Sequence, residues 1–129
     1  MQHEQHQNAE MLAKKCSNRT LEKIVIAHNN NPVGYHDFCK SLPCKIVGVG
    51  VHDNVMFWIL DSDFSIWLKP SSTCSWREKA SNCTRIKMVT DKGDVCYDDP
   101  RGFSLRAIEF LPNRSATIER LRLLKEQTK

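Results

Sequence analysis

Apolar residues occupy consecutive positions, instead of alternate ones, in the stretch VMFWILDSDFSIWLKP at residues 55–70. An unbroken apolar run at 55–60 is followed by the acidic turn DSD and by a second, shorter apolar run. Strands with one face in water alternate between apolar and polar residues, so this pattern predicts a β-hairpin whose two faces are both covered. Two of the three tryptophans in the chain, Trp58 and Trp67, lie on it.

The register of this hairpin decides which side chains share a face. A loop with an even number of residues places Trp58 opposite Trp67, with Lys69 and Ser65 on the same face. The opposite face then carries Phe57, Ile59, Ile66 and Leu68. An odd loop mixes polar and apolar residues on both faces. Because a slip of one residue reverses every side chain, burial of one clean face favours the even loop, with both tryptophans facing outward.

The rest of the chain shows shorter patterns. Strands are predicted at 45–51, where two glycines permit sharp coiling, and at 85–89, 94–97 and 103–110. The segment 21–28 fits a strand or the end of a helix, and one helical turn is expected at 76–80. The final segment predicts a helix with Ser115 as its N-cap and with Ile118, Leu121 and Leu124 forming one apolar ridge. The predicted organisation is therefore a flexible arm at 1–20 with a possible short helix, a barrel at 21–112 and a C-terminal helix at 113–129.

Composition and charge restrict the class of protein. The chain of 129 residues is long enough for one domain with a core, and its net charge is +4. The last 29 residues hold 7 basic and 3 acidic groups, so the whole surplus of positive charge lies in this segment. The segment either attracts phosphates or forms a solvated helix face. The sequence has neither an apolar run of about 20 residues nor a signal peptide, which predicts an intracellular protein without a membrane segment. The 6 cysteines are spaced irregularly, and we interpret them as reduced thiols.

The strand pattern resembles a known family. VGVGV followed by MFWILDSDFSIWL resembles the hairpin of OB-fold subunits, in particular the middle subunit of replication protein A and the Stn subunit of the telomeric CST complex. KGDVCY and RGFSLRAIEFLPN are similar to the fourth and fifth strands of that family, so the resemblance covers about residues 42–126. The acidic turn is shorter than the family's, as in the OB subunits of the fruit-fly telomere cap. The resemblance implies an all-β fold with flanking helices, namely a five-stranded OB-fold barrel with a C-terminal helix.

The same resemblance implies single-stranded DNA binding and assembly, in telomere protection in the nucleus. The residues expected to stack on bases or neutralise phosphates are Trp58, Trp67, Phe103, Lys45, Lys69, Arg101 and Arg106. Binding by the subunit alone is expected to be weak, because few basic residues lie near the groove. The resemblance also implies that Ile118, Leu121 and Leu124 bind another OB-fold or telomere-capping subunit. Alternatively, this ridge packs on its own barrel, and the C-terminal helix or the leading arm covers the tryptophans.

Two other classes of function fit the sequence less well. A Tudor-like protein-interaction adaptor without nucleic-acid binding is the alternative, since an aromatic pair can also cage methylated cations. Such a domain needs another strand after 103–110, where this sequence has Pro112 and a helix. Catalysis is not expected: Cys39 and Cys44 near His36 lack an activating context and the CxxC spacing of zinc sites. No cofactor and no metal are predicted.

Overall fold

The computed structural model describes residues 15–26, 32, 34–52, 55–69, 75–98 and 108–127. In chain order the elements are β1 (Thr20–Ile26), α2 (Tyr35–Lys40), β2 (Cys44–His52), β3 (Val55–Leu60), β4 (Phe64–Leu68), β5 (Ser75–Arg77), β6 (Thr84–Thr90), β7 (Gly93–Asp98), β8 (Ile108–Pro112) and α3 (Arg114–Gln127). The strands form one 8-stranded antiparallel sheet in the order β5-β7-β6-β1-β2-β3-β4-β8. The end strands β5 and β8 do not pair with each other, so the sheet stays open.

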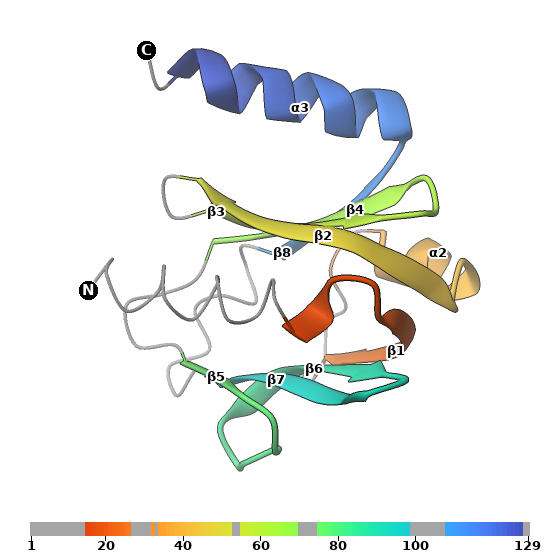
Figure 1. Cartoon of the computed structure of the whole chain (residues 1–129), viewed down its shortest axis with the longest axis vertical. Coiled ribbons are helices and arrows are strands. Elements are labelled where there is room, and N and C mark those ends of the chain that lie inside the picture. The colour runs from red at the N-terminus through yellow and green to blue at the C-terminus, as the bar shows by residue number, and fades with distance from the viewer. Residues whose placement is uncertain are drawn as a thin grey trace.

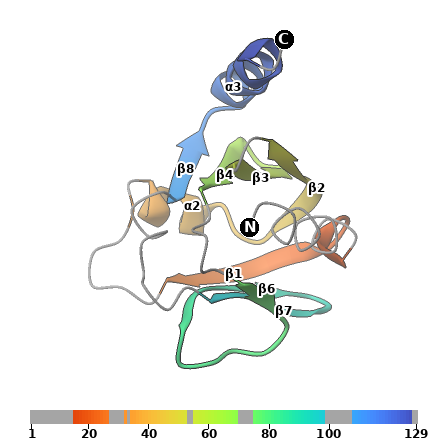
Figure 2. The same ribbon diagram turned by 90° about the vertical axis from the view of Figure 1, so that its left-hand side faces the viewer.

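The sheet bends where β1 meets β2. These two strands share only the pairs Thr20↔Lys45 and Leu21↔Cys44. By contrast, β1 pairs with β6, and β2 with β3, over most of their length. The bend produces two packed layers, which Figures 1 and 2 show one above the other. The β3 layer contains β2, β3, β4 and β8, and the β6 layer contains β1, β6, β7 and β5. Helix α3 lies on the outer side of the β3 layer (Figure 1).

The core lies between the two layers. Alternate residues of each strand point inward, which gives the burial pattern of β3 and β6. Aromatic rings join the layers: Trp76 of β5 lies 5.6 Å from Trp58 of β3 and 4.7 Å from Tyr97 of β7, measured between ring centres. Phe38 of the short helix α2 stacks on Phe110 of β8 at 4.8 Å and closes one side.

The predicted five-stranded barrel is wrong. Residues 21–26 of the segment 21–28, whose pattern fits a strand or the end of a helix, lie in strand β1, in the middle of the sheet between β6 and β2; residues 27 and 28 lie outside the described residues. The predicted helical turn at 76–80 begins inside β5, whose Trp76 faces the core. Both strands belong to the sheet of eight strands, which folds into two layers instead of closing. A small closed barrel of the Tudor kind is excluded for the same reason.

The predicted hairpin register is also wrong. The structure pairs Phe57 with Trp67, Trp58 with Ile66 and Ile59 with Ser65, which corresponds to an odd loop. The two tryptophans therefore lie on opposite faces of the hairpin. An even loop is favoured only if a single face is buried, but the β6 layer covers one face of the hairpin and α3 contacts the other. Ser65 is tolerated on a buried face because its hydroxyl is hydrogen bonded.

Two glycines are required by close approaches. A Cβ atom on Gly50 would lie 2.5 Å from the ring of Phe57, its cross-strand partner, so only glycine lets this ring lie on the strand. Gly34, just before α2, has φ +84° and would place a Cβ 2.8 Å from the carbonyl oxygen of Phe110. Gly34 thus lets the chain before α2 pack against the edge strand β8.

Helix α3 starts differently from the prediction. Asn113 is its N-cap, because the Asn113 Oδ1 accepts hydrogen bonds from the backbone N–H groups of Ser115 at 2.8 Å and Ala116 at 3.4 Å. Ser115 lies inside the first turn instead of capping it. Within the described residues, no helix combines the length and the apolar character that a membrane crossing requires.

Candidate nucleic-acid interface

The first residue expected to stack on bases, Trp58, lies in the core. Its side chain is 0% exposed, and it packs against Trp76 and Ile66 between the layers. A base cannot reach this ring without opening the domain. The prediction that Trp58 contacts nucleic acid is therefore wrong.

The second tryptophan, Trp67, lies under α3 and is 3% exposed. Its indole N–H donates to the Ser65 Oγ at 2.8 Å, and this hydroxyl is 2.6 Å from the Thr117 Oγ1 of α3. The guanidinium of Arg120 covers the ring, 5.2 Å from its centre. The aromatic pair is therefore no exposed platform for stacking, and the alternative that the C-terminal helix covers the aromatic face is correct for Trp67.

The remaining predicted contacts with nucleic acid do not form one track. Lys45 and Lys69 are both exposed, but Lys45 lies beside Asp61 at one end of β3, and Lys69 lies beside Val55 at the other. Lys69 and Trp67 share a hollow of about 350 Å³ with Leu124, Glu109 and Arg120. The last three predicted residues, Arg101, Phe103 and Arg106, lie outside the described residues.

The three residues predicted to bind a partner do not form a single ridge. Ile118 is 61% exposed, whereas Leu121 and Leu124 are half-buried. Thr117 of α3 makes a polar contact with β4, and Arg120 of α3 makes polar contacts with β4 and β8. Ile118 and Leu121 line one hollow beside α3, and Leu124 lines another. The partner role of these residues remains a prediction.

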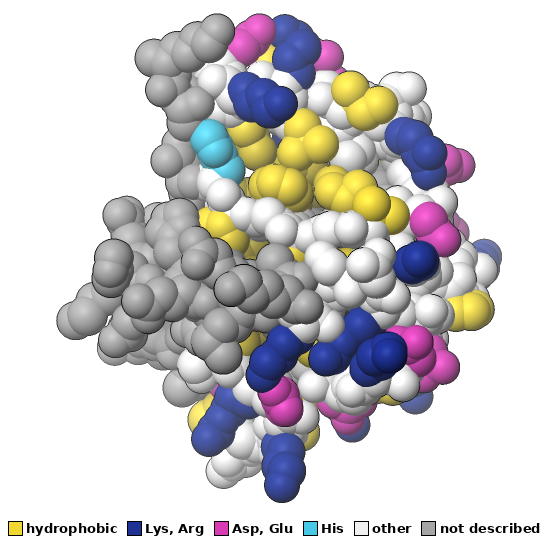
Figure 3. Space-filling model, in the orientation of Figure 1, with side chains coloured by type: hydrophobic (Ala, Val, Ile, Leu, Met, Phe, Trp, Pro, Cys, Tyr) yellow, Lys and Arg dark blue, Asp and Glu magenta, His cyan; other side chains and the backbone are white. Residues whose placement is uncertain are grey.

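Sequence reasoning missed a basic surface on the other layer. The outer face of the β6 layer carries Lys23 of β1, Arg77 of β5, and Arg85 and Lys87 of β6, a set that we call the basic face. Lys23 pairs with Val89 and Lys87 pairs with Val25, so the two lysines are diagonal neighbours, about 7–8 Å apart at their Cα atoms. Cys96 of β7 pairs with Lys87 of β6 on one side and with Arg77 of β5 on the other. Figure 3 shows Lys and Arg side chains over this layer, with acidic side chains among them.

Two carboxylates reduce the charge of the basic face. Lys87 lies 3.4 Å from Asp94, and both side chains are partly exposed. Arg77 lies 3.4 Å from Asp98, which is almost completely buried. Ion pairs at the surface contribute little, so a lysine paired in this way can exchange its carboxylate for a phosphate at small cost. The alternation Arg85-Ile86-Lys87 is the signal in the sequence that could have located this face.

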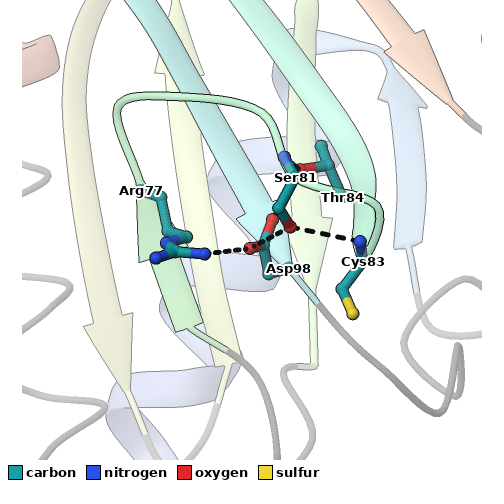
Figure 4. Close-up of polar contacts among 5 residues, drawn as sticks. All are labelled: Arg77, Ser81, Cys83, Thr84 and Asp98. Atoms are coloured by element: carbon teal, nitrogen blue, oxygen red, sulfur yellow. Dashed lines mark hydrogen bonds and ion pairs between the residues drawn. The ribbon is translucent and has the colours of Figure 1, made fainter.

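Asp98 organises the loop beside the basic face. Its Oδ2 accepts a hydrogen bond from the Ser81 hydroxyl at 2.8 Å, and its Oδ1 accepts one from the Thr84 hydroxyl at 2.6 Å. The Ser81 Oγ in turn accepts from the backbone N–H of Cys83 at 3.1 Å (Figure 4). These contacts tie the β5–β6 connection to β7. The carboxylate thereby holds Arg77 at the edge of the basic face.

The three buried thiols of Cys16, Cys44 and Cys96 are poorly suited to nucleophilic chemistry. Burial raises the pKa of the Cys16 and Cys96 thiols, and burial together with the Asp61 carboxylate raises the pKa of Cys44 to about 11. A protonated thiol is a weak nucleophile and metal ligand. In the described part of the chain, no group of three or more His, Cys, Asp and Glu side chains is placed to hold a metal ion.

Comparisons with known proteins concern the fold. No family model and no curated protein sequence matches the chain. Solved structures of DNA glycosylases match it. MutM (Fpg) from Thermus thermophilus matches with a TM-score of 0.71 and 17% identity over 85% of this chain. Lactococcus lactis Fpg with DNA containing N7-benzyl-Fapy-dG matches with a TM-score of 0.76 and 15% identity over 92% of this chain. MutM with DNA containing carbocyclic 8-oxo-G matches with a TM-score of 0.73 and 16% identity over 88% of this chain.

The likeness corrects the predicted resemblance. The fold is related to that of the Fpg and MutM structures, and the resemblance to OB-fold subunits of replication protein A and CST is wrong. The predicted telomeric role and location depended on that resemblance and lose their support with it. This chain spans 40% of the matched Thermus protein and 45% of the Lactococcus protein, and the low identity makes the likeness one of fold.

Proposed function

We propose that this domain binds DNA through the basic face, and that it acts by binding instead of catalysis. The observation that supports the proposal is the shared fold, because the matching structures include an Fpg bound to DNA with an AP site and MutM with DNA containing 8-oxo-G. DNA affinity in general depends on neutralising phosphates with Lys and Arg, and the basic face offers four such side chains on one side of the β6 layer.

The chemistry of the basic face favours duplex DNA over single strands. Its described residues include no aromatic side chain, because Trp76 and Tyr97 point into the core. The Lys and Arg side chains of the basic face are expected to contact the phosphate backbone, and such contacts carry no direct sequence information. A duplex presents one charge per about 1.7 Å of its axis, a single strand about one per 3.4 Å. We therefore expect duplexes to bind more tightly, without sequence preference.

The test is a fluorescence anisotropy titration of a short labelled duplex with the wild-type domain and two charge-matched variants. Lys23→Gln combined with Lys87→Gln changes the basic face, and we expect roughly tenfold weaker binding. Lys45→Gln combined with Lys69→Gln removes the same charge from the β3 layer and should change affinity less than twofold. Equal losses in both variants would show that only net charge matters and would overturn the assignment of the face.

The catalytic part of the proposal has its own readout. Duplexes containing an AP site or 8-oxo-G should bind the domain and remain intact during prolonged incubation. Release of a base or cleavage of the labelled strand by the wild-type domain would contradict a binding role without catalysis. DNA binding itself would be unaffected by that outcome.

A further inference from the structure

A groove runs between α3 and the β3 layer, on the side away from the hollow at Trp67. Its volume is about 370 Å³, and Val47, Phe64, Ile118 and Leu121 contribute apolar side chains to it. Two of them are unusually accessible for aliphatic residues, since Val47 is 56% and Ile118 61% exposed. Figure 3 shows hydrophobic side chains gathered below α3 on this face. A contiguous exposed apolar patch of this kind is typical of an interaction site.

One end of the groove is acidic. Asp61 and Asp63, both exposed, belong to the turn between β3 and β4 and line the groove beside Phe64. Arg114 fixes this turn from α3, because its guanidinium donates to the carbonyl oxygens of Asp61 at 3.1 Å and of Ser62 at 3.2 Å. The Asp61 Oδ1 accepts from the backbone N–H of Lys45 at 2.8 Å, so the turn presents two carboxylates, that of Asp61 already hydrogen bonded, next to an apolar floor and the Arg114 side chain.

We propose that this groove binds a short segment of a partner protein, one that presents a bulky aliphatic or aromatic side chain next to a Lys or Arg. The apolar floor takes the bulky side chain, and the carboxylates of Asp61 and Asp63 attract the basic one. The volume lies near the lower end of ligand pockets, about 300–1,000 Å³, which suits one or two large side chains. A second copy of the chain, which would bury about 1,200–2,000 Å² in a stable dimer, is the competing occupant, and the sedimentation experiment below distinguishes it.

The experiment selects peptides from a phage-displayed random dodecapeptide library on the immobilised full chain. We expect groove-dependent peptides that combine Leu, Phe or Trp with a neighbouring Lys or Arg. The synthetic peptide should bind at least tenfold more weakly to a variant with Val47→Asp and Ile118→Asp, which both change exposed side chains. Asp63→Lys should weaken binding of the basic peptide and strengthen binding of an analogue with Glu in place of the basic residues. Lys23→Gln with Lys87→Gln should leave peptide binding unchanged, which separates this site from DNA binding.

Several results would overturn the proposal. The library could yield no groove-dependent peptide, or it could yield acidic sequences. The Asp63→Lys variant could also bind the selected peptide as tightly as the wild type does. Circular dichroism of each variant checks that the fold is retained. Sedimentation of the wild type as a dimer, with a monomeric Val47→Asp/Ile118→Asp variant, would assign the groove to a second copy and reject the partner segment.

Discussion

The guanidinium of Arg120 in α3 lies 5.2 Å from the centre of the Trp67 ring in β4. The same guanidinium makes two hydrogen bonds to the Glu109 carboxylate of β8, at 2.7 and 3.1 Å. One helical side chain therefore contacts two neighbouring strands and covers an indole that would otherwise face solvent. Trp67 is thus covered by the chain itself and needs no nucleic acid to shield it.

Ser65 should be the main polar contributor to the attachment of α3. Its hydroxyl bonds both the Trp67 indole N–H and the Thr117 hydroxyl, and all three groups are buried. Ser65→Ala leaves two buried polar groups without this partner, so we expect a loss of about 1–3 kcal/mol in the free energy of unfolding. Urea denaturation measures it. In a double-mutant cycle with Thr117→Val the two effects should be non-additive, and additive losses would show that the hydroxyls do not interact.

Gly34 should be intolerant of a side chain. Its φ of +84° and the 2.8 Å approach of a Cβ atom to the Phe110 carbonyl oxygen both oppose alanine. Gly34→Ala is expected to lower the free energy of unfolding by about 1–3 kcal/mol. Gly48→Ala is the control, because nothing lies within 4 Å of its Cβ position, and it should change stability by no more than about 0.5 kcal/mol. Equal effects of the two substitutions would contradict the close packing of Gly34 on β8.

Asp98 should stabilise the loop between β5 and β6. Asp98→Asn removes the charge that accepts from the Ser81 and Thr84 hydroxyls, and we expect a loss of about 2–4 kcal/mol. Trypsin should then cut faster after the exposed Lys79 in this loop. Asp94→Asn, on the same strand but partly exposed, should change stability by less than about 0.5 kcal/mol. An Asp98→Asn domain as stable and as protease-resistant as wild type would reject this role.

Cys44 should make stability fall at alkaline pH. Burial and the Asp61 carboxylate raise the pKa of its thiol to about 11 in the folded chain, whereas an exposed thiol ionises near pH 8.5, so folding favours the protonated form. This contribution is complete below about pH 8.5 and is lost as the pH rises toward about 11. Urea midpoints over this range should fall more steeply for wild type than for Cys44→Ala. Parallel curves for the two proteins would contradict the raised pKa.

The sequence predicts several strands well but not how they pair. The apolar runs at 45–51 and 55–60 become β2 and β3, and the consecutive apolar residues indicate a hairpin covered on both faces. The register could not be derived, because one of the two hydrogen bonds that allow Ser65 on a buried face involves Thr117, 52 residues away. The number of strands was underestimated, since the three residues of β5 are too short to show a pattern.

The basic face was hidden for a similar reason. Lys23, Arg77 and Lys87 are far apart in the sequence, and only the pairing of β1 and β5 with their neighbours brings these side chains to one surface. The charge surplus of the last 29 residues drew attention to α3 instead. There Arg120 and Arg122 are engaged with carboxylates of Glu109, Glu119 and Glu126.

The most direct test of the account is the salt dependence of duplex binding. We expect the logarithm of the affinity to fall linearly with the logarithm of the salt concentration, with a slope of about −0.9 for each phosphate neutralised. Lys23→Gln combined with Lys87→Gln should make this slope shallower by about 2 if both lysines contact phosphates. Asp94→Asn should raise the affinity by removing a repulsive carboxylate beside Lys87. An unchanged slope in the lysine variant, with the slope reduced instead by Lys45→Gln and Lys69→Gln, would contradict DNA binding through the β6 layer.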